Sequence, residues 1–453
     1  MDEEVQIPSD APLRVRHLKL SGANRTQPHV FESELQQAYT ATTVHGVLQG
    51  VHNAAAALHG LGIFDRVDVM LDRAEGGSSN EADVCITVKE RGIRVLHAGN
   101  RSDTSLEAST TGQLTNPFGN GEVISGSAGA SLAGTTSYAL RLVRPRVAGR
   151  DASLILQARQ ETHDQLRTSS FTELSRGLVA TLRSHDGAHA LTGEMTWRDV
   201  MPRRHPTVPY AHAASLSVLR ESRPSVRSSM RYAYTQDGRD SPYVPTVGPY
   251  LQASHREAAV PPGDVSFLKG HIALQQHMSF VDLAPIFLSV NPLPISLGVC
   301  LGLGAVRPFG SDAGKPARIS DRYFLGGPMM LRGFKVAGTG PRAPKEEGGN
   351  LEGDSLGGDI RATASAALSF PFPVSPLAQW GVRLQLFANA GNLTTWQTPL
   401  DRMHRDARAA VGVGIVSSLF GMGRVEATWS HVLRKAPHDQ TRRAQFGMGL
   451  VFE

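Results

Sequence analysis

The stretch Leu283–Val306, LAPIFLSVNPLPISLGVCLGLGAV, has no charged residue and is long enough to suggest a transmembrane helix. Its interior argues against a helix, because each of its prolines would remove a helical hydrogen bond. From Ile295 onward large apolar residues and small residues alternate. One side would carry Ile295, Leu297, Val299, Leu301 and Leu303, and the other Ser296, Gly298, Cys300, Gly302 and Gly304. This alternation predicts a β-strand with one face toward lipid and the other toward a crowded barrel interior.

The composition of the chain fits such strands. The chain has 453 residues and a mass of 48.6 kDa, with 40% hydrophobic and 19% charged residues and a mean hydropathy of −0.20. Apolar residues are too plentiful for a disordered chain, and a polytopic helical membrane protein would need several apolar runs of about 20 residues. Composition alone leaves a soluble all-β or α/β protein and a transmembrane β-barrel, whose apolar residues alternate with polar ones. Period-2 segments recur from Gly92 to the last residue and favour the barrel.

The first 91 residues have a different pattern, in the order β-α-α-β-β. A strand at Val15–Leu20 precedes two predicted helices, and Thr43 is the expected N-cap of the second. Two strands, Phe64–Leu71 and Asp83–Val88, follow across a turn rich in Gly, Ser and Asn. We therefore expect a polar tail (1–13), a small α+β domain (14–91) and a barrel (92–453).

The barrel segment contains roughly sixteen candidate antiparallel strands, an even number, as a barrel with both ends on one side requires. Their expected starts lie near Leu106, Val123, Tyr138, Ser153, Phe171, Ala188, Ala213, Arg227, Pro249, Ser266, Ile295, Ile360, Gly381, Ala407, Arg424 and Arg443. The fold class is thus mainly β, a 16-stranded transmembrane barrel that follows one α+β domain.

A long connection, about 307–357, interrupts the strands. It is far longer than a median loop, which indicates either a functional segment or disorder. Its middle, Phe324–Phe334 or FLGGPMMLRGF, is apolar and compact, unlike a disordered linker. We expect this segment to pack against the rest of the protein.

The segment Phe324–Phe334 resembles the signature of the large inward-folded loop in the bacterial surface antigen superfamily, the BamA-type outer-membrane barrel assembly proteins. The β-α-α-β-β start resembles a single polypeptide-transport-associated (POTRA) domain. Leu114–Glu122, LTNPFGNGE, resembles the turn after the first barrel strand, and Phe387–Asn392, FANAGN, resembles a late-strand motif. The single POTRA domain, an N-terminus without a signal peptide and the Asn form of the late-strand motif are similar to the mitochondrial branch, the core channels of the sorting and assembly machinery (SAM).

This resemblance implies a membrane insertase that folds β-barrel precursors and inserts them into the mitochondrial outer membrane, with its POTRA domain toward the intermembrane space. The implied partners are unfolded porin-type precursors, accessory SAM subunits and the lipid bilayer, and a second barrel is left open. Two other classes also remain open, a translocation pore of the two-partner secretion type and a structural tether of membrane complexes.

Covalent chemistry is not expected. The sequence has no HExxH, GxSxG or P-loop motif, and Cys85 and Cys300 lack metal-ligand spacing, so we predict no enzyme, cofactor or metal site. The 46 basic and 41 acidic residues give a net charge of +5 that is spread along the chain, which argues against nucleic-acid binding.

The resemblance also identifies a loop motif, Leu331, Arg332, Gly333 and Phe334, that would fold into the lumen. A buried guanidinium must be hydrogen-bonded or paired. In relatives the acceptor is often a late-strand carboxylate, but this chain has Asn389 at that motif position. Asp359 or Glu426 would then supply the charge, and our hypothesis is that Asn389 and Asp359 hold Arg332.

A lateral seam between the first and last strands is the expected working site. Gly447 and Gly449 should weaken the pairing of the last strand, because glycine in a strand loses entropy and packing. The first strand would then pair with the precursor's last strand through Leu106, Ala108, Thr110, Gly112 and Leu114. The chain's own C-terminus resembles a mitochondrial β-signal, with the pattern Gln445, Gly447, Leu450 and Phe452.

Overall fold

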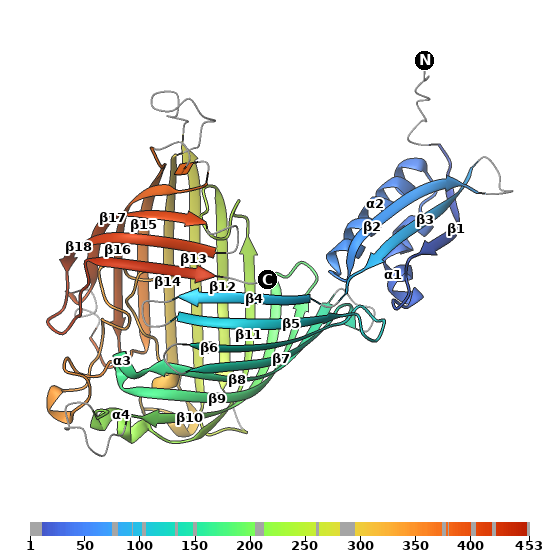
Figure 1. Ribbon diagram of the computed structural model, residues 1–453. Coiled ribbons are helices and arrows are strands. Elements are labelled where there is room, and N and C mark those ends of the chain that lie inside the picture. Colours follow the sequence, from blue (N-terminus) through green and yellow to red (C-terminus); the bar gives the residue numbers. More distant parts are fainter. Residues whose placement is uncertain are drawn as a thin grey trace. The chain divides into compact units, whose positions relative to one another are not determined.

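The computed structural model (Figure 1) describes residues 11–74, 80–92, 94–101, 106–131, 135–147, 152–203, 213–259, 262–280, 295–373, 377–378, 380–399, 405–418 and 423–450. The chain groups into two compact units. The first comprises Met1–Leu96, Thr111–Ser127 and Leu140–Gln157, and the second His97–Thr110, Ala128–Ala139 and Ala158–Glu453. The first unit thus contains the predicted α+β domain together with two later segments.

The α+β domain has the predicted order β-α-α-β-β. Its elements are β1 (Arg14–Ser21), α1 (Pro28–Thr40), α2 (Val44–Gly60), β2 (Phe64–Arg73) and β3 (Glu81–Glu90). The sheet order is β1-β3-β2, with β1 parallel and β2 antiparallel to β3. The hydroxyl of Thr43 accepts the Gly46 N–H at 3.2 Å, which confirms the predicted N-cap of α2. The core buries Phe31, Val47, Leu58, Ile63, Phe64, Val84 and Ile86 between the helices and the sheet.

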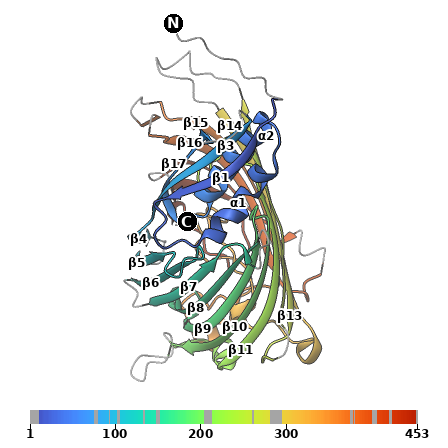
Figure 2. The same cartoon turned by 90° about the vertical axis from the view of Figure 1, so that its right-hand side faces the viewer.

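The second sheet has sixteen strands within the described residues, and each lies beside its neighbours in sequence. They are β4 (Arg94–Arg101), β5 (Leu106–Thr115), β6 (Val123–Ser131), β7 (Thr136–Arg144), β8 (Ala152–Gln165), β9 (Phe171–Ser184), β10 (His189–Pro202), β11 (Ser225–Asp237), β12 (Gly248–Ala259), β13 (Phe267–Phe280), β14 (Ile295–Pro308), β15 (Ile360–Pro371), β16 (Arg383–Thr394), β17 (Arg408–Ser418), β18 (Gly423–Arg434) and β19 (Ala444–Leu450). Figure 2 shows successive strands from β4 to β11 side by side. The strands β4 and β19 stand at the two ends of the order.

The number of strands agrees with the prediction, but two assignments were wrong. The expected strand near Ala213 is absent from the described part of 204–224, where the chain instead forms α4 (Leu216–Glu221). The helical turn buries Val218 completely against a cluster that includes Phe171 and Ile319. The missed strand is β4, whose sequence RVLHAGNR has charged ends and little apolar alternation. Leu106–Leu114 therefore lies on the second strand of the sheet and not on the first.

The strand β14 confirms the alternation predicted from Ile295 onward. Leu301 and Leu303 are exposed on one face. On the other face space is short, because a Cβ at Gly298 would come 2.6 Å from Nδ1 of His277, and a Cβ at Gly304 would come 2.7 Å from the ring of Tyr323. The small residues are thus required by a filled interior. Among the helices in the described ranges, none is long and apolar enough to cross a membrane.

Candidate functional site: the inward loop and the last strand

The connection between β14 and β15, residues 309–359, folds against the inner face of the sheet and is named the inward loop here. It contains three short 3-10 turns, η4 (Gly310–Asp312), η5 (Ile319–Asp321) and η6 (Lys345–Glu347). Its apolar side chains Leu325, Leu331 and Phe334 are fully buried, in one cluster with Leu393 of β16 and Ala410 of β17. The expectation that this segment packs against the rest of the protein is confirmed, and its ends lie two residues beyond those predicted.

Gly333 allows the loop motif to approach the sheet closely. Its φ is +91°, a left-handed conformation that glycine adopts at little cost. A Cβ at this position would lie 3.1 Å from Cβ of Ala410 and 3.2 Å from Cγ2 of Val432. From the sheet side, Gly391 leaves the same kind of space, because a Cβ there would lie 3.1 Å from Cδ1 of Leu331. Glycine is therefore needed on both sides of this contact.

Arg332 forms a two-pronged ion pair with Glu426 of β18. Its Nε donates to Oε1 at 3.0 Å and its Nη2 to Oε2 at 2.9 Å, while Glu426 is only 1% exposed. Arg424 also donates to Oε2 of Glu426, through Nη2 at 2.8 Å. The guanidinium of Arg332 lies 4.9 Å from the ring centre of Phe387, which adds a cation–π contact. Removing Glu426 would leave both Arg332 and Arg424 without their carboxylate.

The structure separates the three proposed acceptors. Glu426 receives the guanidinium of Arg332. Asn389 lies against the backbone of Arg332. In the amide orientation that gives both polar atoms a hydrogen-bond partner, its oxygen accepts the Arg332 N–H at 2.7 Å and its nitrogen donates to the Ala410 carbonyl at 3.2 Å. The hypothesis for Asp359 is wrong, because its carboxylate accepts the Trp396 N–H at 3.3 Å, away from the guanidinium. Asp359 directly precedes β15, whereas Glu426 lies on β18, the strand beside β19.

Gln445 of β19 holds the loop motif by its backbone. Its Oε1 accepts the Gly333 N–H at 2.8 Å, and its Nε2 donates to the Phe334 carbonyl at 2.7 Å. The side chain is 4% exposed, so water does not compete for these groups. In the segment before β19, the Arg442 N–H donates to the Gly333 carbonyl at 2.9 Å. The last strand is thus tied to the inward loop as well as to β18.

The glycines of the last strand face the tip of the inward loop. A Cβ at Gly447 would lie 3.0 Å from Cβ of Pro328 and 3.2 Å from Sδ of Met329. At Gly449 the nearest atom would be Cε of Met329 at 3.6 Å, an ordinary contact. Packing against Pro328 and Met329 therefore favours glycine at position 447, in addition to the expected effect of this glycine on strand pairing.

A second attachment of the inward loop was not predicted from the sequence. Oδ1 and Oδ2 of Asp321, in η5, accept from Arg198 of β10 at 2.7 and 3.0 Å, and Arg227 of β11 lies 3.7 Å from Oδ1. Burial by itself would raise the pKa of Asp321, but Arg198 and Arg227 hold it below its usual value. The sequence signal for this contact is a pair of arginines, Arg198 and Arg227, on the inward faces of adjacent strands. The loop is thus held at β10–β11 and again at β18–β19.

The residues expected at the seam lie in several places. Leu106, Ala108, Thr110, Gly112 and Leu114 are on β5, because β4 precedes it in the sheet. Gly447 and Gly449 are on β19, where Gly447 pairs in register with Glu426 and Gly449 with Arg424. Of the β-signal residues, Gln445 and Gly447 contact the loop, Leu450 pairs with Gly423, and Phe452 lies outside the described residues.

One α+β domain before a 16-stranded antiparallel transmembrane barrel with an inward loop is the architecture of an outer-membrane barrel protein of the Omp85 type. The chain belongs to the Omp85 superfamily, since residues 116–452 match the Omp85 superfamily domain. It is a Sam50/Omp85-type protein.

Known proteins resemble the chain over almost its whole length. It is 28% identical over 457 residues to the sorting and assembly machinery component 50 homologs of Bos taurus and Homo sapiens, an overlap of 97% of this chain and 90% of each relative. A SAM50-like protein of Schizosaccharomyces pombe is 25% identical, with 98% of this chain and 92% of that protein covered.

Two solved structures share the fold. BamA from Haemophilus ducreyi lacking POTRA domains 1–3 aligns with a TM-score of 0.74 at 18% identity, over 96% of this chain and 85% of that one. CdiB from Acinetobacter baumannii aligns with a TM-score of 0.53 at 12% identity, over 97% of this chain and 74% of that one.

Proposed function

We propose that this protein folds β-barrel precursors and inserts them into the mitochondrial outer membrane, at a seam between β4 and β19. Membership of the Omp85 superfamily and the similarity to component 50 of the sorting and assembly machinery support a role in β-barrel assembly. The α+β domain would face the intermembrane space. The process needs no covalent step, only the exchange of one strand pairing for another.

The observation that carries this proposal is the way β19 is held. Its ladder with β18 joins seven residues in register, Ala444–Leu450 with Gly423–Trp429. Its contacts with the inward loop include the amide of Gln445 on the loop backbone and the close approach of Pro328 at Gly447. An incoming strand with a polar residue and a glycine at the same spacing would make the same contacts. The position of β19 is therefore suited to an exchange of β19 for the last strand of a precursor.

The membrane supplies the driving force for pairing. A backbone N–H or carbonyl without a partner is costly in lipid, so a free strand edge there attracts any strand that pairs with it. In the proposed seam, β4 takes the templating role that the sequence predicts for Leu106–Leu114, because β4 and not β5 stands at the end of the strand order. The precursor's last strand would pair with β4 while β19 leaves the inward loop.

The proposed partners are unfolded porin-type precursors and accessory subunits of a SAM-type complex. A second barrel that shares the opened seam is a further candidate. Each of these partners would act at the edges β4 and β19 or on the α+β domain, the parts of the protein that the seam mechanism leaves accessible.

Insertion into proteoliposomes tests the proposal. The purified full-length chain is reconstituted, and a porin precursor is added from outside. Integration of the precursor as a protease-resistant barrel is expected. Passage of the precursor into the vesicle lumen without integration would instead identify a translocation pore, and an unchanged precursor would favour a structural tether.

A further inference from the structure

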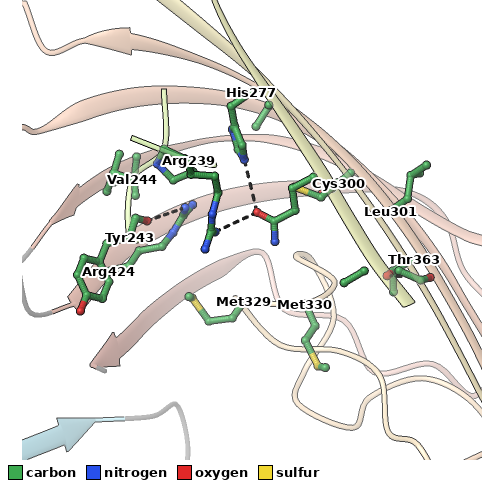
Figure 3. A pocket seen from close by; sticks show the side chains of 18 of the residues that line it. Arg239, Tyr243, Val244, His277, Cys300, Leu301, Met329, Met330, Thr363 and Arg424 are labelled. Carbon is green, nitrogen blue, oxygen red and sulfur yellow. Dashed lines mark hydrogen bonds between the residues drawn. The ribbon is translucent and has the colours of Figure 1, made fainter. Parts of the chain in front are cut away.

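A cavity of about 370 Å³ lies between the strands β13–β15, the connection from β11 to β12 and the tip of the inward loop (Figure 3). Met329 and Met330 form the loop side of its wall, and Tyr243 and Val244 come from the connection. Its size is within the range of small-ligand sites. The basic side chains that line it are Arg239, Arg332, Arg361, Arg424, His271 and His277.

The wall carries more positive than negative charge. No Asp or Glu is among the described residues that line the cavity. Carboxylates outside the lining pair with three of the arginines: Glu426 is shared by Arg332 and Arg424, and Asp237 accepts from Nη2 of Arg239 at 2.7 Å. The four guanidinium groups of the lining thus exceed by two the carboxylates that pair with them.

Arg361 of β15 carries one of these excess charges. Its Nη2 lies 3.3 Å from Nδ1 of His271, and its guanidinium lies 4.8 Å from the ring centre of Tyr323. Its Nε is buried and has no hydrogen-bond partner within the part of the chain that the structure describes. Because a guanidinium only donates, His271 is a neutral acceptor in this contact. Arg361 is half-buried, and an anion that enters beside its guanidinium would stabilise this charge.

Arg239 and Arg424 reach the same space from different elements. In Figure 3, Arg239 extends from the β11–β12 connection and Arg424 from β18 toward the centre of the cavity. Nη1 of Arg239 donates to Oε1 of Gln275 at 3.2 Å, and Nη1 of Arg424 donates to the Tyr243 carbonyl at 3.3 Å. These contacts hold both side chains in place. A ligand would therefore meet guanidinium groups that are already positioned, which lowers the entropy cost of binding.

We propose that this cavity is a binding site for a small oxyanion, a phosphate or carboxylate group. Guanidinium groups bind the oxygens of such groups with paired, charge-assisted hydrogen bonds, whereas a spherical chloride ion accepts no such pair. The anion would come from a free metabolite or from a lipid headgroup. It would lie beside Arg332 and Met329, so its binding would stabilise the tip of the inward loop. This inference is independent of the proposed insertase activity.

Calorimetric titration of the full-length protein in detergent with inorganic phosphate tests the site, with chloride at equal ionic strength as reference. We expect saturable phosphate binding that Arg361→Gln weakens by about tenfold or more, the loss typical of a hydrogen bond to a charged group. Arg239→Gln should act in the same direction and replaces Arg361→Gln if that variant does not fold. Arg176→Gln is the matched control, because it removes one positive charge from an exposed side chain of β9 outside the cavity.

Two results would overturn the site: phosphate binding no stronger than chloride binding, or equal affinities in Arg361→Gln, Arg176→Gln and the unmodified protein. Phosphate titrations in nanodiscs with and without phosphatidic acid distinguish the two sources of the anion. Phosphate affinity that is the same in both discs supports a free anion, and phosphate affinity lost only in the phosphatidic-acid discs supports a headgroup at the same arginines.

Discussion

The side-chain amide of Gln445, on the last strand, accepts the backbone N–H of Gly333, in the inward loop, at 2.8 Å. The same amide donates to the carbonyl of Phe334 at 2.7 Å. These two bonds join residues more than a hundred positions apart in sequence, and both are buried. Because of these bonds, the position of the inward loop depends on the side chain that β19 carries at position 445.

Replacing Gln445 with Leu should loosen the loop. The Gly333 N–H and the Phe334 carbonyl would lose their partners, and each buried unsatisfied group costs about 1–3 kcal/mol. We expect a lower unfolding temperature in detergent and faster proteolysis within the inward loop. Gln440→Leu is the control, because the hydrogen bonds of Gln440 to the loop residues Lys335 and Gly338 are made by its backbone and are kept. Equal effects of the two substitutions would exclude the role given to the Gln445 side chain.

The two partners of the buried ion pair should differ in their effects. Glu426→Ala would leave both Arg332 and Arg424 without their carboxylate, whereas Arg332→Ala would leave Glu426 paired with Arg424. Breaking a buried pair costs about 3–5 kcal/mol, so Glu426→Ala should approach that loss and Arg332→Ala should fall below it. Chemical denaturation of the refolded protein measures both. The shared-carboxylate geometry fails if Arg332→Ala is the more damaging change.

The two glycines of β19 should not be equivalent. In Gly447→Ala the new methyl group would lie 3.0 Å from Pro328, and the strain of overpacking costs about 1–3 kcal/mol. In Gly449→Ala the nearest atom is 3.6 Å away, so the substitution should be tolerated. Thermal unfolding of both variants compares them. Equal stability of the two proteins would contradict the packing of Pro328 on β19.

Acid should loosen the start of α1 through Glu90. Its Oε1 accepts from the Thr26 hydroxyl at 2.7 Å and from the Thr26 N–H at 2.8 Å. Burial by itself would raise the pKa of Glu90, but the hydrogen bonds from Thr26 and Arg25 hold it below its usual value. A lowered folded-state pKa stabilises the fold above the unfolded pKa of about 4.3, and this stability is lost as the pH falls through the folded-state pKa.

Hydrogen exchange of the full-length protein at several pH values checks this prediction. Amides at the start of α1 should exchange faster in acid in the unmodified chain, after correction for the intrinsic rate. Glu90→Gln should already exchange fast at neutral pH and change little in acid. A pH dependence that persists in Glu90→Gln would assign the effect to another group.

The sequence predicted those parts of the molecule in which one residue pattern determines local structure. The alternation from Ile295 predicted β14, and Thr43 predicted the start of α2, because strand period and helix capping are local properties. The strand β4 was missed because its residues alternate weakly and its place is set by its neighbour in the sheet. Near Ala213 the burial of Val218 in a long-range cluster favoured a helical turn over a strand.

The partners of the inward loop could be predicted only in part. Glu426 was one candidate among several for Arg332, and choosing it requires the registers from β15 to β18, which the sequence does not show. The contact of Asp321 with Arg198 joins residues 123 positions apart and carries no local pattern. Gln445 was identified as part of a strand signal, while its contact with Gly333 emerges only when the loop and the strand meet in space.

The central claim is that the last strand of a precursor replaces β19 against the inward loop. Cysteine cross-linking measures this replacement directly. One cysteine is Met329→Cys, in a protein whose Cys85 and Cys300 are changed to Ser. The other replaces the precursor glycine that lies two positions after the polar residue of its signal. Leu351→Cys, exposed in the same loop, is the control. The account predicts a cross-link at position 329 and none at 351 during insertion. A precursor that inserts without any cross-link at position 329 would contradict it.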